Sequence, residues 1–312
     1  MTLPPLPPLR GRLQQLVPLG PQTWFRVGGE AELLFRPADV EDLAAFLAAW
    51  PAELPLVVLG AASNVIIRDG GIPGAVVQLR RGFADIVCEG ERIIAGAGVL
   101  DVTLAEHAAL AGIAGLEFLC GIPGTLGGAV AMNAGAYGGE IADVLSWAEV
   151  VLRSGERVRL GAGELRFAYR EAALPPGAVV VRAELRGRAG RREAILARMQ
   201  EIRNRREATQ PVRARTGGST FRNPLPGEST LKAWELIALA GCRGLRRGQA
   251  VVSPLHCNFL INEGGASAAD LEGLGEEVRS RVKAASGVDL VWEIRRFGRP
   301  LAGGDALAGG EA

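Results

Sequence analysis

The chain has 312 residues, which is too long for one ordinary hydrophobic core and fits two or three domains. Apolar residues make up 48% of it and can fill those cores. Its formal net charge of +1 excludes a generally basic nucleic-acid-binding protein. Nearly all the positive charge is arginine, since the only lysines are Lys232 and Lys283, and ten arginines lie between Arg186 and Arg215. Arginine binds phosphate or carboxylate with two donors, so this run indicates either an anionic partner or a solvated helix face.

The cysteines indicate a reduced compartment. The four cysteines, Cys88, Cys120, Cys242 and Cys257, show no CxxC motif and no paired spacing. With only two histidines in the chain, no metal cluster is apparent. The N-terminal sequence MTLPPLPPLRGRL has prolines where a signal peptide needs an apolar helix, and no later run approaches about 18 uncharged apolar residues. We therefore expect a soluble, cytoplasmic protein without a metal.

The first part of the chain predicts an α+β arrangement. LLFRP at residues 33–37 reads as a short strand, and Asp39 caps an apolar-periodic helix that continues to about Trp50. PLVVLG, VIIRDGG and AVVQL then read as strands separated by glycine turns. RIIAGAGV at 92–99 predicts another strand, followed by a helix over 102–111.

The remainder continues the mixed pattern. Strands are expected around 148–152 and 179–185, and a charged helix over 193–208 ends before Pro211. Helices are then expected over 231–240 and 270–286, the second capped near Ser267, with strands at HCNFLIN and VWEIRRF. The last residues, AGGDALAGGEA, read as a loose tail.

A glycine-dense segment, GIPGTLGGAVAMNAGAYGG, spans Gly121–Gly139 and carries no charge. Glycine is costly to order and adds no side chain, so such density indicates backbone that bends unusually or lies close to a ligand. We interpret the segment as a long loop against which a flat, apolar cofactor stacks. A buried glycine-rich crossover without a ligand is the alternative.

A second candidate is the turn Gly60-Ala61-Ala62-Ser63-Asn64, between two apolar β-branched runs. Converging backbone N–H groups there would form an anion-binding nest, with Ser63 and Asn64 adding side-chain donors. On its residue types alone a plain hairpin turn is favoured. It has no GxGxxG or Walker pattern, and a strand follows it, so a Rossmann site is not expected.

Three side chains are candidates for chemistry. Ser219 lies in the polar loop GGSTFRNP without a neighbouring histidine, Arg170 follows two aromatics in FAYRE, and Glu293 interrupts the apolar strand VWEI. They suit a proton donor, a carboxylate clamp and a half-buried acid, respectively. A turn residue, a surface ion pair and a solvent-facing carboxylate are the alternatives. His107 and His256 are interpreted as packed or capping residues.

Taken together, these motifs resemble the UDP-N-acetylenolpyruvoylglucosamine reductase family, flavoenzymes of bacterial peptidoglycan precursor synthesis. The matching segments lie in family order between Thr23 and Gly298, and they are TWFRVGGEAELLFRP, VLGAASNVIIRDGG, the glycine-dense segment, FAYRE, GGSTFRNP, VVSPLHCNFLIN and VWEIRRFG. The chain resembles the shorter class, which lacks an inserted tyrosine-bearing loop. It departs from the pattern at Ala61 and Ala62, where relatives often have glycine, and in the helix KAWELIAL.

The resemblance implies an α+β fold with an FAD-binding region of the vanillyl-alcohol-oxidase type. The implied division is a leader at 1–22, FAD-binding subdomains at 23–80 and 81–205, a substrate domain at 206–298 and a tail at 299–312. The resemblance reverses the hairpin interpretation, because in such proteins the turn at 60–64 holds the FAD pyrophosphate. The implied partners are small molecules, with no nucleic acid or membrane, and the protein is expected to be a monomer.

The implied catalytic residues are Arg170, Ser219 and Glu293, and NADPH is the implied electron donor. The residues implied to contact FAD are Gly60, Ala61, Ala62, Ser63, Asn64, Gly121, Ile122, Pro123, Gly124, Thr125, Gly127, Gly128, Ala129, Asn133, Gly135 and Ala136. Those implied to contact the substrate are Arg170, Asn223, Lys232 and Asn258, with Glu235 near the diphosphate.

The implied reaction passes a hydride from NADPH through FAD to the enolpyruvyl group of UDP-N-acetylglucosamine enolpyruvate. Two alternatives are an FAD-linked oxidase of the same cofactor fold with another substrate, and a nucleotide-binding module without catalysis. The presence of the third-domain motifs disfavours the first, and the presence of all three catalytic side chains disfavours the second.

Overall fold

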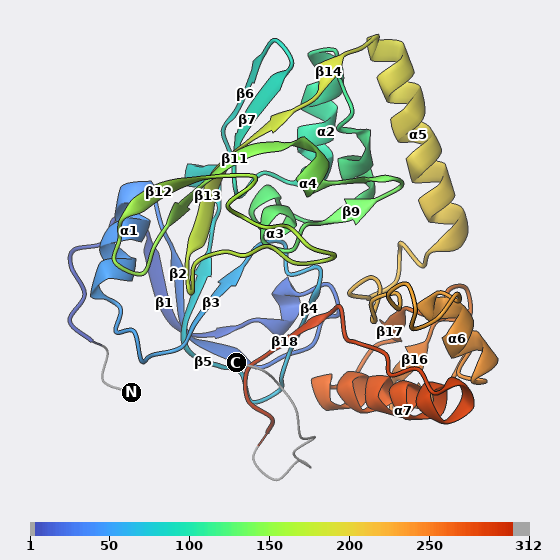
Figure 1. Cartoon of the computed structure of the whole chain (residues 1–312). Coiled ribbons are helices and arrows are strands. Elements are labelled where there is room, and N and C mark those ends of the chain that lie inside the picture. Colours follow the sequence, from blue (N-terminus) through green and yellow to red (C-terminus); the bar gives the residue numbers. More distant parts are fainter. Residues whose placement is uncertain (1–3, 302–312) are drawn as a thin grey trace. The chain divides into compact units, whose positions relative to one another are not determined.

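The structure is a computed structural model that describes residues 4–301 (Figure 1). The described residues group into two compact units. Unit 1 comprises residues 4–15, 33–61 and 74–206, and unit 2 comprises residues 16–32, 62–73 and 207–301. Each unit mixes helices with strands, as the α+β prediction requires.

The first sheet has the strand order β1-β2-β5-β3. Its strands are β1 (Arg12–Pro18), β2 (Glu30–Arg36), β3 (Leu56–Leu59) and β5 (Ile72–Gln78). β3 and β5 run parallel, with Leu56 opposite Ala75. β1 lies inside the stretch 1–22 that was expected to be a leader, so that stretch contributes a strand.

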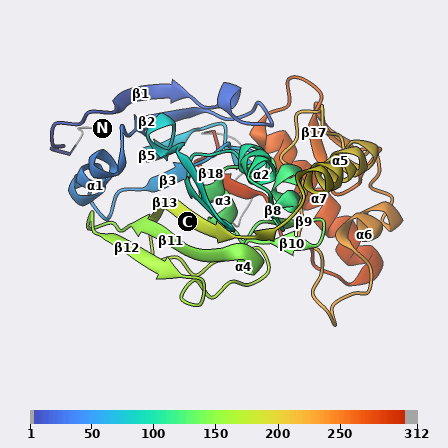
Figure 2. The same ribbon diagram turned by 90° about the horizontal axis from the view of Figure 1, so that it is seen from above.

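A five-stranded antiparallel sheet follows, in the order β12-β11-β13-β7-β6. Its strands are β6 (Ile86–Glu89), β7 (Arg92–Gly96), β11 (Leu145–Val151), β12 (Arg157–Gly161) and β13 (Val179–Arg186). β13 is the central strand, and five of the eight residues in its sequence VVVRAELR are apolar, as a mostly buried strand requires. Seen from above, β1, β2, β5 and β3 follow one another, and β13, β11 and β12 continue the series (Figure 2).

Unit 1 also contains helices, and the cap of the first one is among the residues predicted from the sequence. They are α1 (Val40–Ala49), α2 (Asp101–Leu110), α4 (Ile141–Val144) and α5 (Arg192–Thr209), with 3-10 turns at Arg81–Phe83 and Glu117–Gly121. The predicted cap of α1 is confirmed, because the Asp39 side chain accepts a hydrogen bond from the Asp42 N–H. Two short strands, β8 (Ile113–Ala114) and β14 (Arg188–Ala189), form an antiparallel pair in the same unit.

The glycine-dense segment is not a long loop, contrary to the prediction. It contains the helix α3 (Leu126–Ala131) and a hairpin of β9 (Gly135–Ala136) and β10 (Gly139–Glu140). The hairpin turn has φ of +53° at Tyr137 and +89° at Gly138, the two positive values that a two-residue turn favours. Packing overrides the low helix propensity of LGGAVA, because Leu126 and Val130 are fully buried.

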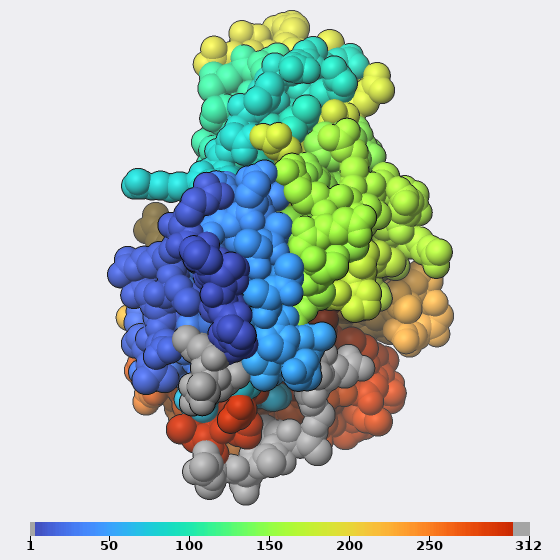
Figure 3. Space-filling model, turned by 90° about the vertical axis from the view of Figure 1, so that its left-hand side faces the viewer, coloured from blue at the N-terminus to red at the C-terminus, as the bar shows by residue number. Residues whose placement is uncertain are grey.

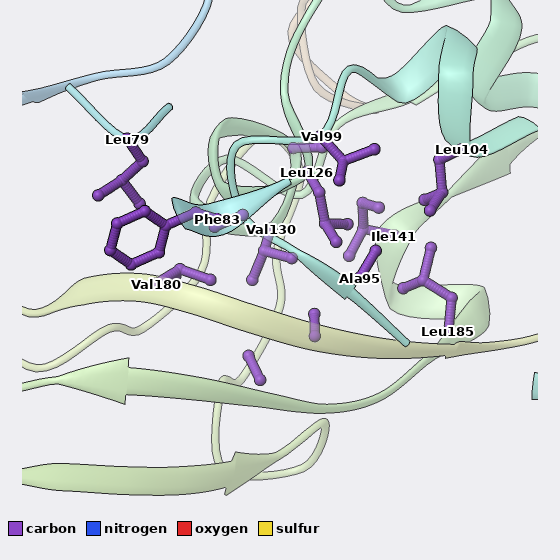
Figure 4. Packing of buried hydrophobic residues seen from close by; sticks show 14 of the residues in the cluster. Leu79, Phe83, Ala95, Val99, Leu104, Leu126, Val130, Ile141, Val180 and Leu185 are labelled. Atoms are coloured by element: carbon purple, nitrogen blue, oxygen red, sulfur yellow. The ribbon is translucent and has the colours of Figure 1, made fainter. Parts of the chain in front are cut away.

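The core of unit 1 lies against one side of β13. Figure 4 shows Val180 and Leu185 of β13 close to Leu126 and Val130 of α3 and to Ile141, all of them in one buried cluster. Each such side chain contributes about 1.5–3 kcal/mol by leaving water. On the face in Figure 3, the light-blue and green segments of this unit lie side by side.

Unit 2 contains a three-stranded sheet, a parallel strand pair and two helices. Its elements are a 3-10 turn (Gly20–Gln22), β4 (Val65–Ile67), α6 (Ala233–Leu239), β15 (Arg246–Arg247), β16 (Ala250–Val252), β17 (Leu260–Asn262), α7 (Ala268–Ser286) and β18 (Arg295–Phe297). The sheet order is β15-β16-β17, and β18 pairs with β4 in parallel. Ser267 and Asp270 exchange hydrogen bonds of 3.0 Å in a capping box that begins α7, which confirms the predicted cap.

The boundaries of the two units differ from the domain division that the resemblance implies. The expected boundary after residue 205 lies one residue from the end of unit 1 at Arg206. Residues 23–32 and 62–73, however, group with unit 2, because β4 pairs with β18 and because Phe25 and Ile66 pack in the second core. Of the expected tail, residues 302–312 lie outside the described residues.

Candidate functional site

The turn at 60–64 connects two strands that do not pair with each other. β3 pairs with β5 and β4 pairs with β18, so the hairpin interpretation from residue types alone is wrong. Ala62 has φ of +50°, in the left-handed region that costs a residue with a Cβ about 1–2 kcal/mol. The backbone therefore has a glycine-like conformation at Ala62.

Two segments that were assigned to FAD meet inside unit 1. A Cβ added to Gly60, at the start of the turn, would collide with Oγ1 of Thr125 in the glycine-dense segment. Glycine is thus required at position 60 by this contact. The contact brings two predicted cofactor-binding residues together.

Most glycines of the dense segment are explained by packing within the unit. An added Cβ would lie 2.5 Å from the Tyr137 ring at Gly121, 2.7 Å from Asp101 Oδ2 at Gly124 and 2.9 Å from Ala97 Cβ at Gly127. Gly128 differs, because its Cβ would meet only Thr125 Oγ1, at 3.7 Å, and the residue is exposed. The prediction that these glycines make room for a ring therefore has a competing explanation at 121, 124 and 127.

Asp101 is a buried acid that the sequence analysis missed. It is the first residue of α2, its exposed fraction is 0%, and neither carboxyl oxygen has a hydrogen-bond partner among the described residues. Burial raises the pKa of this carboxyl well above its ordinary value. Because burial disfavours its charged form, this acid is compatible with an anionic cofactor beside Gly124. No local sequence signal marks it, because acids at helix starts are usually solvated.

Asn133 joins the glycine-dense segment to two other segments of unit 1. Its side chain is 1% exposed, Nδ2 donates to the Ala168 carbonyl at 3.0 Å, and Oδ1 accepts from the Ala142 N–H at 2.9 Å. Both polar atoms therefore act within the protein. The sequence assigned Asn133 to FAD, but these bonds indicate a structural task for its side chain.

Arg170 lies in a tight turn next to this segment. Ala168 and Glu171 exchange backbone hydrogen bonds of 3.0 and 3.1 Å around Tyr169 and Arg170. Arg170 has φ of +61°, which a long side chain rarely adopts and which costs of order 1–3 kcal/mol. Its Nη2 donates to the Gly135 carbonyl at 2.9 Å, and its guanidinium lies 5.1 Å from the Tyr169 ring centroid. Strain of this kind is concentrated at functional sites.

Ser219 and Glu293 lie on neighbouring segments of unit 2. The Glu293 N–H donates to the Thr220 carbonyl at 2.8 Å, and Phe221 pairs with Trp292 in an antiparallel bridge. On the other side, Ser219 pairs with Phe259. Backbone hydrogen bonds thus bring two predicted catalytic residues together although they are far apart in sequence.

The turn residue Asn64 attaches to the same group of segments. Its Nδ2 donates to the Glu293 carbonyl at 3.2 Å, and its own carbonyl accepts from the Arg295 N–H at 3.1 Å. The β4–β18 ladder begins one residue further on, with Val65 opposite Arg295. The end of the predicted pyrophosphate turn is therefore in register with the predicted acid.

A buried ion pair in unit 2 connects β4 and β18 to α7. Arg68, which follows β4, donates to Glu272 of α7 at 2.9 Å, and the Glu272 side chain is 6% exposed. Arg296 of β18 lies 3.9 Å from Glu272 and 3.2 Å from Glu276. Charge pairing thus fixes β4 and β18 to the same helix.

The residues implied to contact substrate in unit 2 have local partners. Asn258 is 4% exposed, and its amide accepts from the Phe221 N–H at 3.0 Å and donates to the Phe221 carbonyl at 2.8 Å. Asn223 Oδ1 accepts from the Ala233 N–H at 3.1 Å, beside Lys232 at the start of α6. Substrate contacts at these positions stay predictions.

The described residues contain no group of histidine, cysteine and acidic side chains arranged to hold a metal. All four cysteines are free, and Cys88 is the exposed one. His256 is partly buried, which lowers its pKa, and its Nδ1 accepts from the Asn258 N–H at 3.3 Å. Among the described helices, none is long and apolar enough to cross a bilayer.

The arginine-rich helix α5 carries exposed ion pairs. Arg198 pairs with Glu201 at 2.9 Å, and Arg203 pairs with Glu106 of α2 at 2.8 Å. Exposed pairs of this kind contribute about 0–1 kcal/mol. They agree with the interpretation of this run as a solvated helix face.

Two family models match separate parts of the chain. Residues 31–161 match a family model described as an FAD binding domain, and residues 210–297 match the model of the UDP-N-acetylenolpyruvoylglucosamine reductase C-terminal domain. The second range lies inside the part of unit 2 that contains Ser219, Asn258 and Glu293.

The chain is similar over nearly its whole length to curated reductases. It is 64% identical to UDP-N-acetylenolpyruvoylglucosamine reductase of Acidiphilium cryptum, over 96% of this chain and 95% of the relative, and 60% identical to that of Gluconobacter oxydans, over 96% of each. The crystal structure of the reductase from Thermus caldophilus matches with a TM-score of 0.80 and 36% identity, over 92% of this chain and 100% of that one. This chain belongs to the UDP-N-acetylenolpyruvoylglucosamine reductase family.

Proposed function

We propose that this protein reduces the enolpyruvyl group of UDP-N-acetylglucosamine enolpyruvate to the lactyl ether of UDP-N-acetylmuramate, with NADPH as reductant and FAD as cofactor. Family membership supports the activity, and the FAD-binding model over residues 31–161 supports the cofactor. The observation that carries the residue assignment is the alignment of Ser219, Glu293 and Asn64 on adjoining segments of unit 2.

The residues of the FAD-assigned segments suit a phosphate-bearing cofactor. The turn at 60–64 offers backbone N–H groups and the Ser63 hydroxyl for the pyrophosphate. The glycine-dense segment adds uncharged surface at Gly128 and Ala136, which suits an aromatic ring system. Burial raises the pKa of Asp101 and so disfavours a negative charge beneath this surface.

Bound FAD supplies the hydride chemistry, because it accepts hydride from NADPH and delivers it to C3 of the enolpyruvyl group. Addition at C3 moves negative charge through C2 onto the substrate carboxylate as an enediolate. The charge must be stabilised, and C2 must receive a proton. Both tasks fall to side chains of this chain.

Arg170 is assigned to the developing charge, since a guanidinium binds both carboxylate oxygens with parallel hydrogen bonds. Glu293, when it carries a proton, would donate a further hydrogen bond to the same carboxylate. Ser219 donates its hydroxyl proton to C2 and completes the lactyl ether. The half-buried state of Arg170, Ser219 and Glu293 is compatible with access to a substrate.

The experiment that tests this function follows the flavin colour through one turnover. The purified protein is expected to show flavin absorbance, to bleach anaerobically with NADPH, and to recover its colour when the enolpyruvyl sugar nucleotide is added. A colourless protein that FAD does not reconstitute would overturn the proposal. A flavin that bleaches but ignores this substrate would instead support an oxidoreductase with another substrate.

We also expect the finer properties that accompany this reaction. NADPH and nucleotide sugars are cytoplasmic metabolites, so we place the protein in the cytoplasm, without a nucleic-acid or membrane partner. We expect a monomer. Size-exclusion chromatography with light scattering checks the mass against the 32.7 kDa of one chain.

A further inference from the structure

Arg170 is held in an unfavourable backbone conformation by bonds to the glycine-dense segment. Its φ of +61° is one that glycine adopts freely and arginine does not. A conformation of this kind persists only when its surroundings determine it. The local bonds between Ala168 and Glu171 close a turn in which Arg170 is the second central residue.

Two side-chain bonds tie this turn to the glycine-dense segment. Asn133 Nδ2 donates to the Ala168 carbonyl at 3.0 Å, and Arg170 Nη2 donates to the Gly135 carbonyl at 2.9 Å. Within the segment, the donor Asn133 and the acceptor Gly135 are therefore two residues apart. One bond holds the base of the turn and the other holds the guanidinium.

The Asn133 side chain is buried and has a second bond within unit 1. It is 1% exposed, and its Oδ1 accepts from the Ala142 N–H at 2.9 Å at the start of α4. Its own φ of +43° is in the region that asparagine tolerates better than most residues. An immobile amide of this kind can fix the position of a strained neighbour.

We propose that Asn133 is a positioning residue for Arg170. It holds the strained Tyr169–Arg170 turn against the glycine-dense segment, so that the segment assigned to FAD also places the guanidinium that acts on the substrate carboxylate. The inference rests on the proposed function of Arg170. It replaces the direct FAD contact that the sequence assigned to the Asn133 side chain.

The first test is Asn133→Gly, which suits the positive φ and removes both side-chain bonds. We expect retained flavin, reduction of the flavin by NADPH within about threefold of the parent, and substrate reduction slowed by about 10–100-fold, as for a displaced catalytic group. Equal slowing of the two half-reactions would overturn the inference. Asn133→Asp is the second variant, because it keeps the acceptor for Ala142 and lacks the donor to Ala168.

A double-mutant cycle with Arg170→Gly separates positioning from general loosening. If Asn133 acts through Arg170, the double variant reduces substrate no more slowly than Arg170→Gly alone, within about threefold. If the double variant is slowed by the product of the two single slowings of substrate reduction, Asn133 acts independently of Arg170. Asp143→Ala is the matched control, since it removes the 3.0 Å cap to the Glu140 N–H near Ala142 without a bond to the turn. In the double variant of Asp143→Ala and Arg170→Gly, the slowing of substrate reduction is expected to equal the product of the slowings in the two single variants.

A further readout needs neither cofactor nor substrate. Trypsin cleavage after Arg170 in the cofactor-free protein is expected to accelerate at least about tenfold in Asn133→Gly, while cleavage after the exposed Arg213 stays unchanged. Mass spectrometry of the fragments measures both rates. Unchanged cleavage after Arg170 would overturn the inference. Because the parent protein is assayed beside the variants, failure of its own substrate reduction would be recognised separately as failure of the proposed function.

Discussion

The segments that carry Arg170 and those that carry Ser219 and Glu293 are held in different ways. Ser219 and Glu293 lie on extended segments joined by backbone hydrogen bonds, including the 2.8 Å bond from Glu293 to Thr220. Arg170 lies at φ of +61° in a turn held by the side chain of Asn133 and by its own guanidinium. Backbone pairing tolerates side-chain changes, whereas a strained turn depends on particular side chains. The Arg170 side is therefore expected to be the more sensitive to substitution.

On the Arg170 side, a large effect is expected from removing the strained arginine. Arg170→Gly is expected to slow substrate reduction by about 10²–10³-fold, the range for loss of one charge-stabilising donor in a transition state. It is also expected to raise the free energy of unfolding by up to about 1 kcal/mol, because glycine fits the positive φ. Stopped-flow kinetics and chemical denaturation measure the two effects. Reduced activity with reduced stability would contradict the assignment of strain.

The next prediction concerns the ion pair that supports the Glu293 side. Arg68→Met leaves Glu272, which is 6% exposed in its side chain, without its nearest partner, and is expected to cost about 3 kcal/mol of unfolding free energy. Arg296 at 3.9 Å compensates in part. Urea denaturation measures the loss, and Arg68→Met with Glu272→Leu is expected to recover most of it. No recovery would mean that the pair is not the source of the effect.

The third prediction concerns the pH dependence that Asp101, beneath the glycine-dense segment, gives to the stability. Burial raises its pKa, so the folded state binds more protons than the unfolded state at pH values between the ordinary pKa and the raised one. In that window the free energy of unfolding falls as pH rises, by up to about 1.4 kcal/mol per pH unit. Asp101→Asn lacks this slope.

The measurement for Asp101 is denaturation of both proteins at several pH values. The Asn variant is expected to match the parent near pH 4 and to be the more stable of the two at pH 7. Parallel stability curves would show that Asp101 does not titrate in this window, and so that its burial is compensated.

Local signals predicted most of the longer helices and several strands, but not the long-range pairing of the strands. Asp39 and Ser267 mark helix starts through side-chain chemistry that depends on a few neighbouring residues, and both caps are confirmed. The pairing of β4 with β18 joins Val65 to Arg295, and no local pattern specifies such a partner. This pairing explains why residues 62–73 group with unit 2.

The candidate site shows the same limit more strongly. The resemblance supplied Ser219, Glu293 and Arg170, whereas their residue types alone left turn, surface and ion-pair readings open. The roles of Asn133 and Asp101 escaped the sequence, because they depend on burial and on partners such as Ala168 that only folding brings near. Helix α3 escaped it too, since LGGAVA has weak helix propensity without its packing.

The most direct test of the proposed chemistry is Ser219→Ala, assayed anaerobically in both half-reactions. Flavin reduction by NADPH is expected to stay within about twofold of the parent, while reoxidation by the enolpyruvyl sugar nucleotide slows by about 10²–10⁴-fold, the range for loss of a general acid. Equal slowing of the two half-reactions, or no slowing of the second, would contradict the assignment of Ser219 as the proton donor to C2.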